Sequence, residues 1–388
     1  MAKLGDLCDI LNGYAFKSEQ YVDSGIRIIR IANVQKGYIE DSAPVFYPID
    51  NSEYKKYELK EEDILLSLTG NVGRVALLQK EFLPAALNQR VACLRIKDET
   101  TLNKSFLFNF LNSDYFENKC IESAKGVAQK NMSTEWLKEY EIPFFSIEMQ
   151  RKISKELDEI SNLISLRKQQ LSKLDELVKS RFIELFGDLH STKFPKCKMA
   201  EICNIKHGYA FSGEFFTEED NNILLVTPGN FKVGGGFQEK KCKFFMGEYS
   251  EEYVLNCGDL IVTMTDLSKN MDTLGYSAIV PSTNRVYLHN QRIGLFVDMS
   301  ENINKVFLMY FMQTNEYRDS IITSATGSTV HHTSPSKILD CDVFLPPIEL
   351  QDQFAAFVEQ TDKSKFEIQK SLEKLEILKK ALMKKYFG

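Results

Sequence analysis

Cysteine and histidine are the residues of this chain that could bind a metal or act as nucleophiles, and their spacing favours neither role. None of the eight cysteines forms a C-x-x-C pair, and none lies beside a histidine at metal-ligand spacing. Four of them lie in or next to strand-like apolar runs: Cys8, Cys93, Cys257 and Cys341. Because free cysteine is among the most buried residue types, we expect small buried thiols and no metal site.

The sequence also lacks the motifs of common nucleotide and cofactor sites. No G-x-x-x-x-G-K-[ST] loop for ATP is present, and the glycines at 234–236 are not followed by a helix signal. Pro346-Pro347 is followed by Ile348, so it does not match the Asn/Asp-Pro-Pro-aromatic motif of adenine methyltransferases. Carboxylates are many but form no nuclease-like cluster around a lysine. We therefore expect the chain alone to catalyse no reaction.

The composition is that of a folded chain with two or three domains. Its 388 residues are 43% hydrophobic, which is enough for more than one core. It contains no apolar run of about 18 residues and no signal-peptide pattern at its start, so we expect a cytoplasmic protein without a membrane span. The net charge of −6 argues mildly against a nucleic-acid binder, although a local basic face can coexist with acidic surfaces elsewhere.

An internal repeat organises the whole chain. Gly-Tyr-Ala-Phe at 13–16 recurs at 208–211, and Asn-Gln-Arg at 88–90 recurs at 290–292. Residues 124–187 align without a gap to residues 325–388. The chain is therefore two diverged copies of one module, in which the C-terminal part of each copy keeps its register and the preceding domain varies.

Each copy ends in a segment that predicts a long helix. From Glu148 to Leu185 there is no Pro or Gly, and apolar residues recur at alternating steps of four and three, which is a heptad seam. The seam comprises Ile153, Leu157, Ile160, Ile164, Leu171, Leu174, Val178 and Leu185 in copy one, and Phe354, Val358, Ile368, Leu372, Leu375 and Leu382 in copy two. We expect the two helices, each about 60 Å long at 1.5 Å per residue, to form an antiparallel coiled coil with pseudo-two-fold symmetry.

The domains before the helices predict a mixed α/β fold. Strand-like runs cover residues 26–32, 63–68, 90–96, 223–227, 259–264 and 294–297, and helix-like runs cover 104–111 and 304–312. Loops rich in Gly and Asn separate these runs, as at 69–73 and 234–236.

These features together resemble the specificity subunits of type I restriction–modification systems (HsdS), over essentially the whole length. The resemblance is carried by the two repeated motifs above and by the segment 63–73, which holds Asp-Ile-Leu-Leu-Ser and then Gly-Asn-Val-Gly. It is also carried by the Ile-Glu-x-Gln opening of each helix at 147–150 and 348–351, and by Leu-Phe-Gly-Asp at 185–188. Each motif is weak alone, but all of them occur in order, most of them twice.

The resemblance implies a domain organisation and a set of partners. Target-recognition domains would span 1–145 and 189–346 (the latter with a linker at 189–196), and the conserved helices would span 146–188 and 347–388. The family is non-catalytic: it reads a bipartite double-stranded DNA target and is a scaffold for two methyltransferase subunits (HsdM) and for restriction subunits (HsdR). S-adenosylmethionine would belong to the methyltransferase partner, and ATP and Mg to the restriction partner, with no cofactor in this chain.

Residues that would touch DNA are sought among polar side chains in glycine-containing loops, because base edges and phosphates are recognised by such groups. The candidates in copy one are Tyr14, Lys17, Asn33, Asn71, Arg74, Gln89, Arg90, Gln129, Lys130 and Asn131. Those in copy two are Tyr209, Asn230, Lys232, Gln291, Arg292, Ser328, Thr329, His331 and His332. Packing of the turn is an equal alternative for Tyr14 and Tyr209, and bracing of a neighbouring loop is an equal alternative for Gln89-Arg90. The Gly126 and Gly327 loops are the best candidates for contact.

Two other classes of protein stay open. A structural coiled-coil adaptor whose domains bind proteins would suit the acidic net charge, and DNA binding in the presence of the methyltransferase would exclude it. A self-sufficient DNA methyltransferase is disfavoured by the missing cofactor motifs, and binding of S-adenosylmethionine to the isolated chain would revive it.

Overall fold

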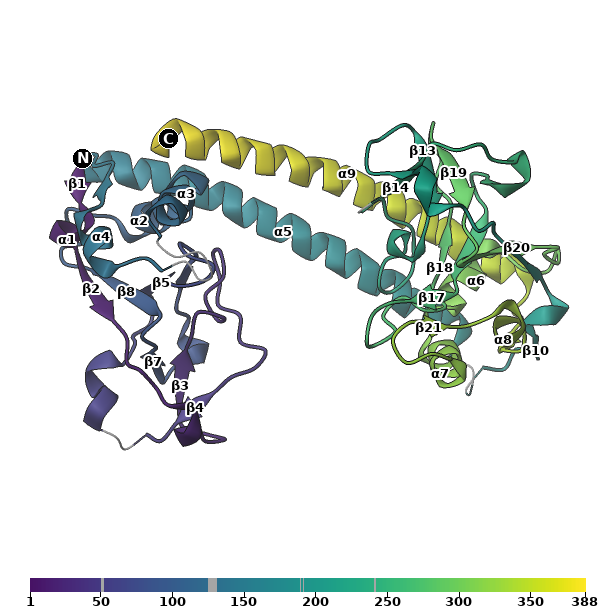
Figure 1. Cartoon of the computed structure of the whole chain (residues 1–388), viewed down its shortest axis with the longest axis horizontal. Helices are drawn as coiled ribbons and strands as arrows, with labels where there is room; N and C mark the ends of the chain where they lie inside the picture. Colours follow the sequence, from purple (N-terminus) through teal and green to yellow (C-terminus); the bar gives the residue numbers. More distant parts are fainter. Residues whose placement is uncertain (50–51, 125–130, 189, 191, 241) are drawn as a thin grey trace. The chain divides into compact units, whose positions relative to one another are not determined.

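The computed structural model describes residues 1–49, 52–124, 131–188, 190, 192–240 and 242–388. It divides into two compact units, one of Met1–Gln169 with Gln369–Gly388 and one of Gln170–Ile368. Two 40-residue helices, α5 (Ile147–Phe186) and α9 (Ile348–Phe387), each contribute one half to each unit (Figure 1). The predicted helix at 148–185 is confirmed within one residue at each end.

The first unit is a mixed α/β domain with parts of both long helices. A four-stranded sheet has the order β2-β8-β5-β6, and a three-stranded sheet has the order β4-β3-β7. The strands are β1 (Ala2–Lys3), β2 (Cys8–Asn12), β3 (Ile26–Ile29), β4 (Phe46–Tyr47), β5 (Ile64–Ser67), β6 (Val75–Leu77), β7 (Ala85–Leu87), β8 (Val91–Ile96) and β9 (Glu141–Ile142). The short helices are α1 (Leu4–Leu7), α2 (Lys104–Leu111), α3 (Asp114–Ser123) and α4 (Thr134–Glu139).

The second unit repeats this plan. A four-stranded sheet has the order β11-β20-β16-β18, and a five-stranded sheet has the order β12-β14-β13-β19-β15. The strands are β10 (Lys196–Lys198), β11 (Asn204–His207), β12 (Phe216–Thr217), β13 (Ile223–Val226), β14 (Lys243–Phe245), β15 (Val254–Leu255), β16 (Leu260–Thr263), β17 (Thr265–Asp266), β18 (Ser277–Ile279), β19 (Val286–His289), β20 (Ile293–Val297), β21 (His331–His332) and β22 (Asp342–Phe344). The short helices are α6 (Lys305–Phe311), α7 (Asn315–Ser324) and α8 (Pro335–Leu339). All eight strand and helix runs expected in the two domains are confirmed, with ends shifted by up to three residues.

Both faces of the four-stranded sheet in the first unit carry core residues, and its inner strand β5 is buried along its whole length. Ile64 and Leu66 face the core formed with α2 and α3, whereas Leu65 faces the core shared with the three-stranded sheet. This alternation follows from the two-residue period of a strand. The cysteines follow the same rule with one exception: Cys8, Cys93 and Cys341 are buried, but Cys257 is exposed. The expectation of a buried thiol at Cys257 is wrong, because this residue lies in the turn before β16 and not in the strand.

The long helices pair antiparallel within each unit. In the first unit Tyr386 donates a hydrogen bond to Glu156 (2.6 Å), and Lys168 lies 3.3 Å from Glu376. In the second, Lys365 contacts Asp175 at 2.6 Å. Every seam residue predicted from the heptads is buried or half-buried. Each helix also ends in a phenylalanine that enters a domain core: Phe186 packs on Phe307, and Phe387 packs on Phe106 and Phe110.

A buried glutamine anchors the start of each long helix and explains the Ile-Glu-x-Gln motif. The Gln150 side chain accepts from the Asn103 amide (2.9 Å) and donates to the Thr101 and Phe145 carbonyls (3.0 and 2.9 Å). Gln351 makes the same three hydrogen bonds, with Asn304, Asn302 and Pro346. Because Asn103 and Asn304 cap α2 and α6, one side chain fixes the long helix against its domain in each copy.

Candidate functional site

The two short motifs that recur in the sequence, Gly-Tyr-Ala-Phe and Asn-Gln-Arg, lie against each other in the fold of each copy. The Tyr14 amide donates to the Leu87 carbonyl (2.8 Å), and the Gln89 amide donates to the Tyr14 carbonyl (2.9 Å). The same pair in copy two joins Tyr209 to His289 and Gln291 (2.8 and 3.0 Å). The Gly-Tyr-Ala-Phe turn therefore sets the position of the Asn-Gln-Arg turn.

The glycine of this turn is required by close approach. A Cβ atom on Gly13 would lie 2.2 Å from the Asn88 carbonyl carbon, and one on Gly208 would lie 2.3 Å from the Asn290 oxygen. The aromatic residues that follow pack beside it: Tyr14 and Phe16 are 5.0 Å apart between ring centroids, and Tyr209 and Phe211 are 5.1 Å apart. Packing accounts for most of the motif, but the Tyr209 ring remains 50% exposed.

Backbone hydrogen bonds then connect three loops in each copy. In copy one the Leu68 amide donates to Arg90 (3.0 Å), and the Met132 amide donates to Leu68 (2.9 Å). In copy two Met264 donates to Arg292 (2.9 Å), and Thr333 donates to Met264 (3.0 Å). We call this set the three-loop edge: the Asn-Gln-Arg turn, the loop after β5 or β16, and the segment that ends at Met132 or Thr333.

Exposed polar side chains extend from the three-loop edge. Gln89, Arg90, Asn71 and Asn131 are exposed in copy one, and Gln291, Arg292, Ser328, Thr329 and His332 in copy two. Lys17 is also exposed, whereas Arg74 is half-buried and bonds to the Gln35 side chain. Gln129 and Lys130 lie outside the described residues.

Two of the residues predicted to contact DNA are buried and stabilise their own loops. Asn33 is buried and bonds to the Arg30 amide (2.9 Å) and the Glu40 carbonyl (2.8 Å). Asn230 is buried and bonds in the same way to Thr227 (2.9 Å) and Gln238 (3.2 Å). Because these amides satisfy backbone groups of their own loops, we do not retain Asn33 and Asn230 as DNA contacts.

The Gly327 loop of copy two is a tight hairpin that pairs with the loop after β16. Thr326 and His332 exchange backbone hydrogen bonds (3.0 and 2.8 Å), and Gly327 has a φ of +96° that suits glycine. β21 pairs with β17 (Figure 1). His332 therefore lies opposite Thr265, and its Nδ1 is 3.2 Å from the Thr265 hydroxyl. The histidines thus belong to a hydrogen-bonded ladder.

In copy two a buried carboxylate, Asp266, holds the loop that follows β16. Asp266 accepts from the Ser268 and Thr273 amides (both 2.5 Å) and from the Leu274 amide (3.0 Å). Burial opposes its ionisation, but these hydrogen bonds hold the pKa of Asp266 below its ordinary value. The loop is therefore rigidly built, with Leu267 at its tip 69% exposed.

A cleft of about 740 Å³ lies beside the three-loop edge of the second unit. Four cations line it: Lys232, Lys240, Lys243 and Arg292. Asp266 is the lining carboxylate, and no ion pair within the described residues neutralises any of the four cations. Lys232 and Arg292 were predicted from sequence. Lys240, Lys243 and Leu267 were missed, because only the fold places them near the Asn-Gln-Arg turn.

The described residues contain neither a metal-binding group nor a membrane-spanning helix. Across the described ranges, no group of three or more His, Cys, Asp or Glu residues is placed to hold a metal ion. No helix in the same ranges is both long and apolar enough to cross a membrane.

The chain belongs to the family of type I restriction modification DNA specificity domains. The family model matches it twice, over residues 1–176 and 193–379, which confirms the family predicted from the sequence. The specificity subunit of the type I restriction enzyme MjaVIII of Methanocaldococcus jannaschii is 30% identical over 184 residues, 46% of this chain and 43% of that one. That of EcoAI of Escherichia coli is 34% identical over 163 residues, 41% and 27% of the two chains. These alignments span less than half of either relative.

The fold is also found among solved structures. The type I restriction–modification S subunit from M. genitalium superposes with a TM-score of 0.58 at 17% identity, covering 100% of this chain and 95% of that one. At this identity the likeness is one of fold, and it agrees with the mixed α/β architecture with two long helices.

Proposed function

We propose that the chain is the DNA-specificity subunit of a type I restriction–modification complex, a non-catalytic reader of a bipartite double-stranded site. Its partners would be methyltransferase subunits, which bind S-adenosylmethionine, and restriction subunits, which use ATP and Mg. The observation that carries the proposal is the three-loop edge, which occurs in both copies with the same backbone hydrogen bonds and different exposed polar side chains.

The chemistry of the edge suits DNA. Arg90 and Arg292 are exposed next to Gln89 and Gln291, and arginine and glutamine are the side chains that make bidentate contacts with guanine and adenine edges. In copy two the lysine-lined cleft would hold phosphates close to those side chains. This local cation group answers the objection raised by the net charge of −6, because phosphate contacts depend on local charge.

The different side chains of the two copies support two different half-sites. We propose that the domains at 1–145 and 189–346 each read one half-site, about one helical turn or 34–36 Å apart, and that the helices 146–188 and 347–388 set the gap. The principal test replaces residues 1–145 by the domain of another family member and maps adenine methylation by the assembled methylase. One half-site should change and the other should stay. A change in both half-sites, or in neither, would contradict the proposal.

Single cations of the cleft provide a second test. Arg292→Gln and Lys232→Gln should each weaken DNA binding by the assembled methylase about tenfold, and each should reduce the slope of log K against log salt by about one. Lys196→Gln is the matched control, because Lys196 is exposed on β10 and does not line the cleft. Equal losses in the control and the cleft variants would contradict a specific role of the cleft in binding phosphates.

A further inference from the structure

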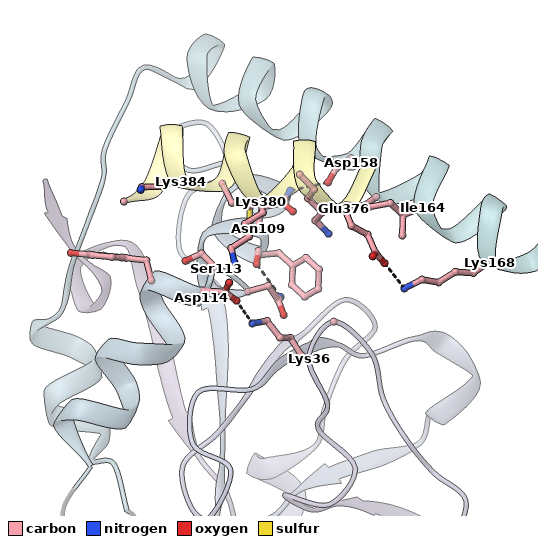
Figure 2. A pocket seen from close by; sticks show the side chains of 18 residues that line it. Lys36, Asn109, Ser113, Asp114, Asp158, Ile164, Lys168, Glu376, Lys380 and Lys384 are labelled. Atoms are coloured by element: carbon pink, nitrogen blue, oxygen red, sulfur yellow. Dashed lines mark hydrogen bonds and ion pairs between the residues drawn. The ribbon is translucent and has the colours of Figure 1, made fainter. Parts of the chain in front are cut away.

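A second cavity, of about 710 Å³, lies within the first unit between α2, α3, the first half of α5 and the last turns of α9 (Figure 2). Its size falls in the range of small-molecule sites. It is made of scaffold residues that the proposed DNA contacts do not use.

The equivalent place in the second unit is filled. The α2 residue Asn109 corresponds to Tyr310 of α6, and the α9 residues Lys379 and Met383 correspond to Val178 and Phe182 of α5, all at a spacing of 201. Tyr310 and Phe182 pack on Phe354 with ring centroids 5.2 and 5.4 Å apart, and Val178 is fully buried. The cavity therefore arises because the first unit has smaller or polar residues where the second unit has a mostly aromatic core.

The side chains around the cavity carry an excess of positive charge. Five lysines line it, together with three side-chain carboxylates and the terminal carboxylate of Gly388. Each side-chain carboxylate already has a partner: Asp114 pairs with Lys36 (2.7 Å) and Glu376 pairs with Lys168 (3.3 Å) (Figure 2). Asp158 accepts hydrogen bonds from Asn109 (2.8 Å) and Ser105. The remaining lysines, Lys379, Lys380 and Lys384, form no ion pair within the described residues.

Lys379 is the least exposed of these three lysines, so its charge is the most costly to bury without a partner. It is half-buried at a position where the second unit has Val178, and burial lowers the pKa of its amine, although the nearby Asp158 carboxylate opposes this shift. Such an ammonium gains most from an anionic partner, because its solvation by water is already reduced.

We propose that this cavity binds a small polyanion, a molecule that carries phosphate or carboxylate groups, and that only the first unit does so. Lys379, Lys380 and Lys384 would bind its charged groups, and the apolar wall formed by Phe108, Ile164 and Met383 would contact the rest. The site is separate from the proposed DNA contacts, so its test does not depend on the proposed function.

The test is calorimetric titration of the full chain with tripolyphosphate and, separately, with citrate at physiological ionic strength. At least one should bind at one site with a Kd below about 1 mM, and the one that binds identifies the charged group. Absence of binding by both would overturn the proposal.

Matched variants locate the site. Lys379→Val, which introduces the residue at the equivalent position of the second unit (Val178), should weaken binding about tenfold or more. Lys374→Val removes the same charge from an exposed position of α9 that does not line the cavity, and should leave binding unchanged. Asn109→Tyr, which introduces the other residue of copy two, should abolish binding by filling the space. Equal weakening by Lys374→Val and Lys379→Val would overturn the proposal, because it would indicate diffuse attraction.

Discussion

The two copies share their backbone framework and differ in the side chains attached to it. Gln150 and Gln351 make the same three hydrogen bonds, and Leu68 and Met264 connect the same three loops. In contrast, the loop after β5 contains glycine and asparagine, whereas the loop after β16 is held by the Asp266 carboxylate. The two copies thus keep the same fold with a few shared backbone anchors, although the side chains around them differ.

Removing a backbone anchor should have the largest effect. Gly208→Ala would place a methyl group 2.3 Å from the Asn290 oxygen, so the turn must move, at a cost of more than about 3 kcal/mol. Urea unfolding followed by hydrogen exchange of peptides from each unit measures the loss where it occurs. Gly213→Ala is the control, because a Cβ atom there would have ordinary contact only, with a Phe216 ring atom 4.0 Å away. A similar loss in both variants would show that close approach is not the cause.

Removing the Gln150 or Gln351 side chain should have the second-largest effect on stability, and the loss should be similar in the two units. Gln150→Leu or Gln351→Leu leaves one amide and two carbonyls without their side-chain partner, which should destabilise the corresponding unit by about 2–5 kcal/mol. The same exchange measurement reports each unit separately. Gln169→Leu, on an exposed face of α5, should change little. If only one of the two substitutions destabilised its unit, the idea that the two copies share a common framework would be contradicted.

Acid should distinguish the two units. Burial lowers the pKa of His289 to about 4 from 6.5, whereas copy one has Leu87 at the equivalent position. Because the folded pKa is the lower one, the full stability is present above about pH 6.5 and is lost as pH falls towards 4.

The loss in the second unit should be on the order of 3 kcal/mol, at about 1.36 kcal/mol per pKa unit. Unfolding of His289→Leu compared with the unchanged chain at pH 7 and pH 4.5 measures it. The variant should lack this part of the pH dependence, although it also loses the bond between His289 Nε2 and the Ile293 carbonyl (2.8 Å). An unchanged pH profile would refute the assignment.

The ion pairs between the long helices should contribute least to the free energy of unfolding. Glu376→Gln and Asp175→Asn each remove one exposed interhelical pair, in the first and the second unit respectively, and should cost less than about 1 kcal/mol. Unfolding at low and high salt measures this, and Glu176→Gln at an exposed position is the control. A loss above about 2 kcal/mol in either unit would mean that charge pairs, and not the buried seam, hold the helices together.

The sequence by itself determined the duplication, the long helices and their seam, because helical periodicity and repeated motifs are local signals that a single chain displays. It also indicated the Asn-Gln-Arg turns and the Gly327 loop. It did not indicate that Asn33 and Asn230 are buried, since a loop amide that caps its own backbone looks like an exposed one in sequence. Only the tertiary structure brought Lys240, Lys243 and Leu267 to Arg292, and only it left a cavity beside Lys379, because both depend on packing between segments far apart in the chain.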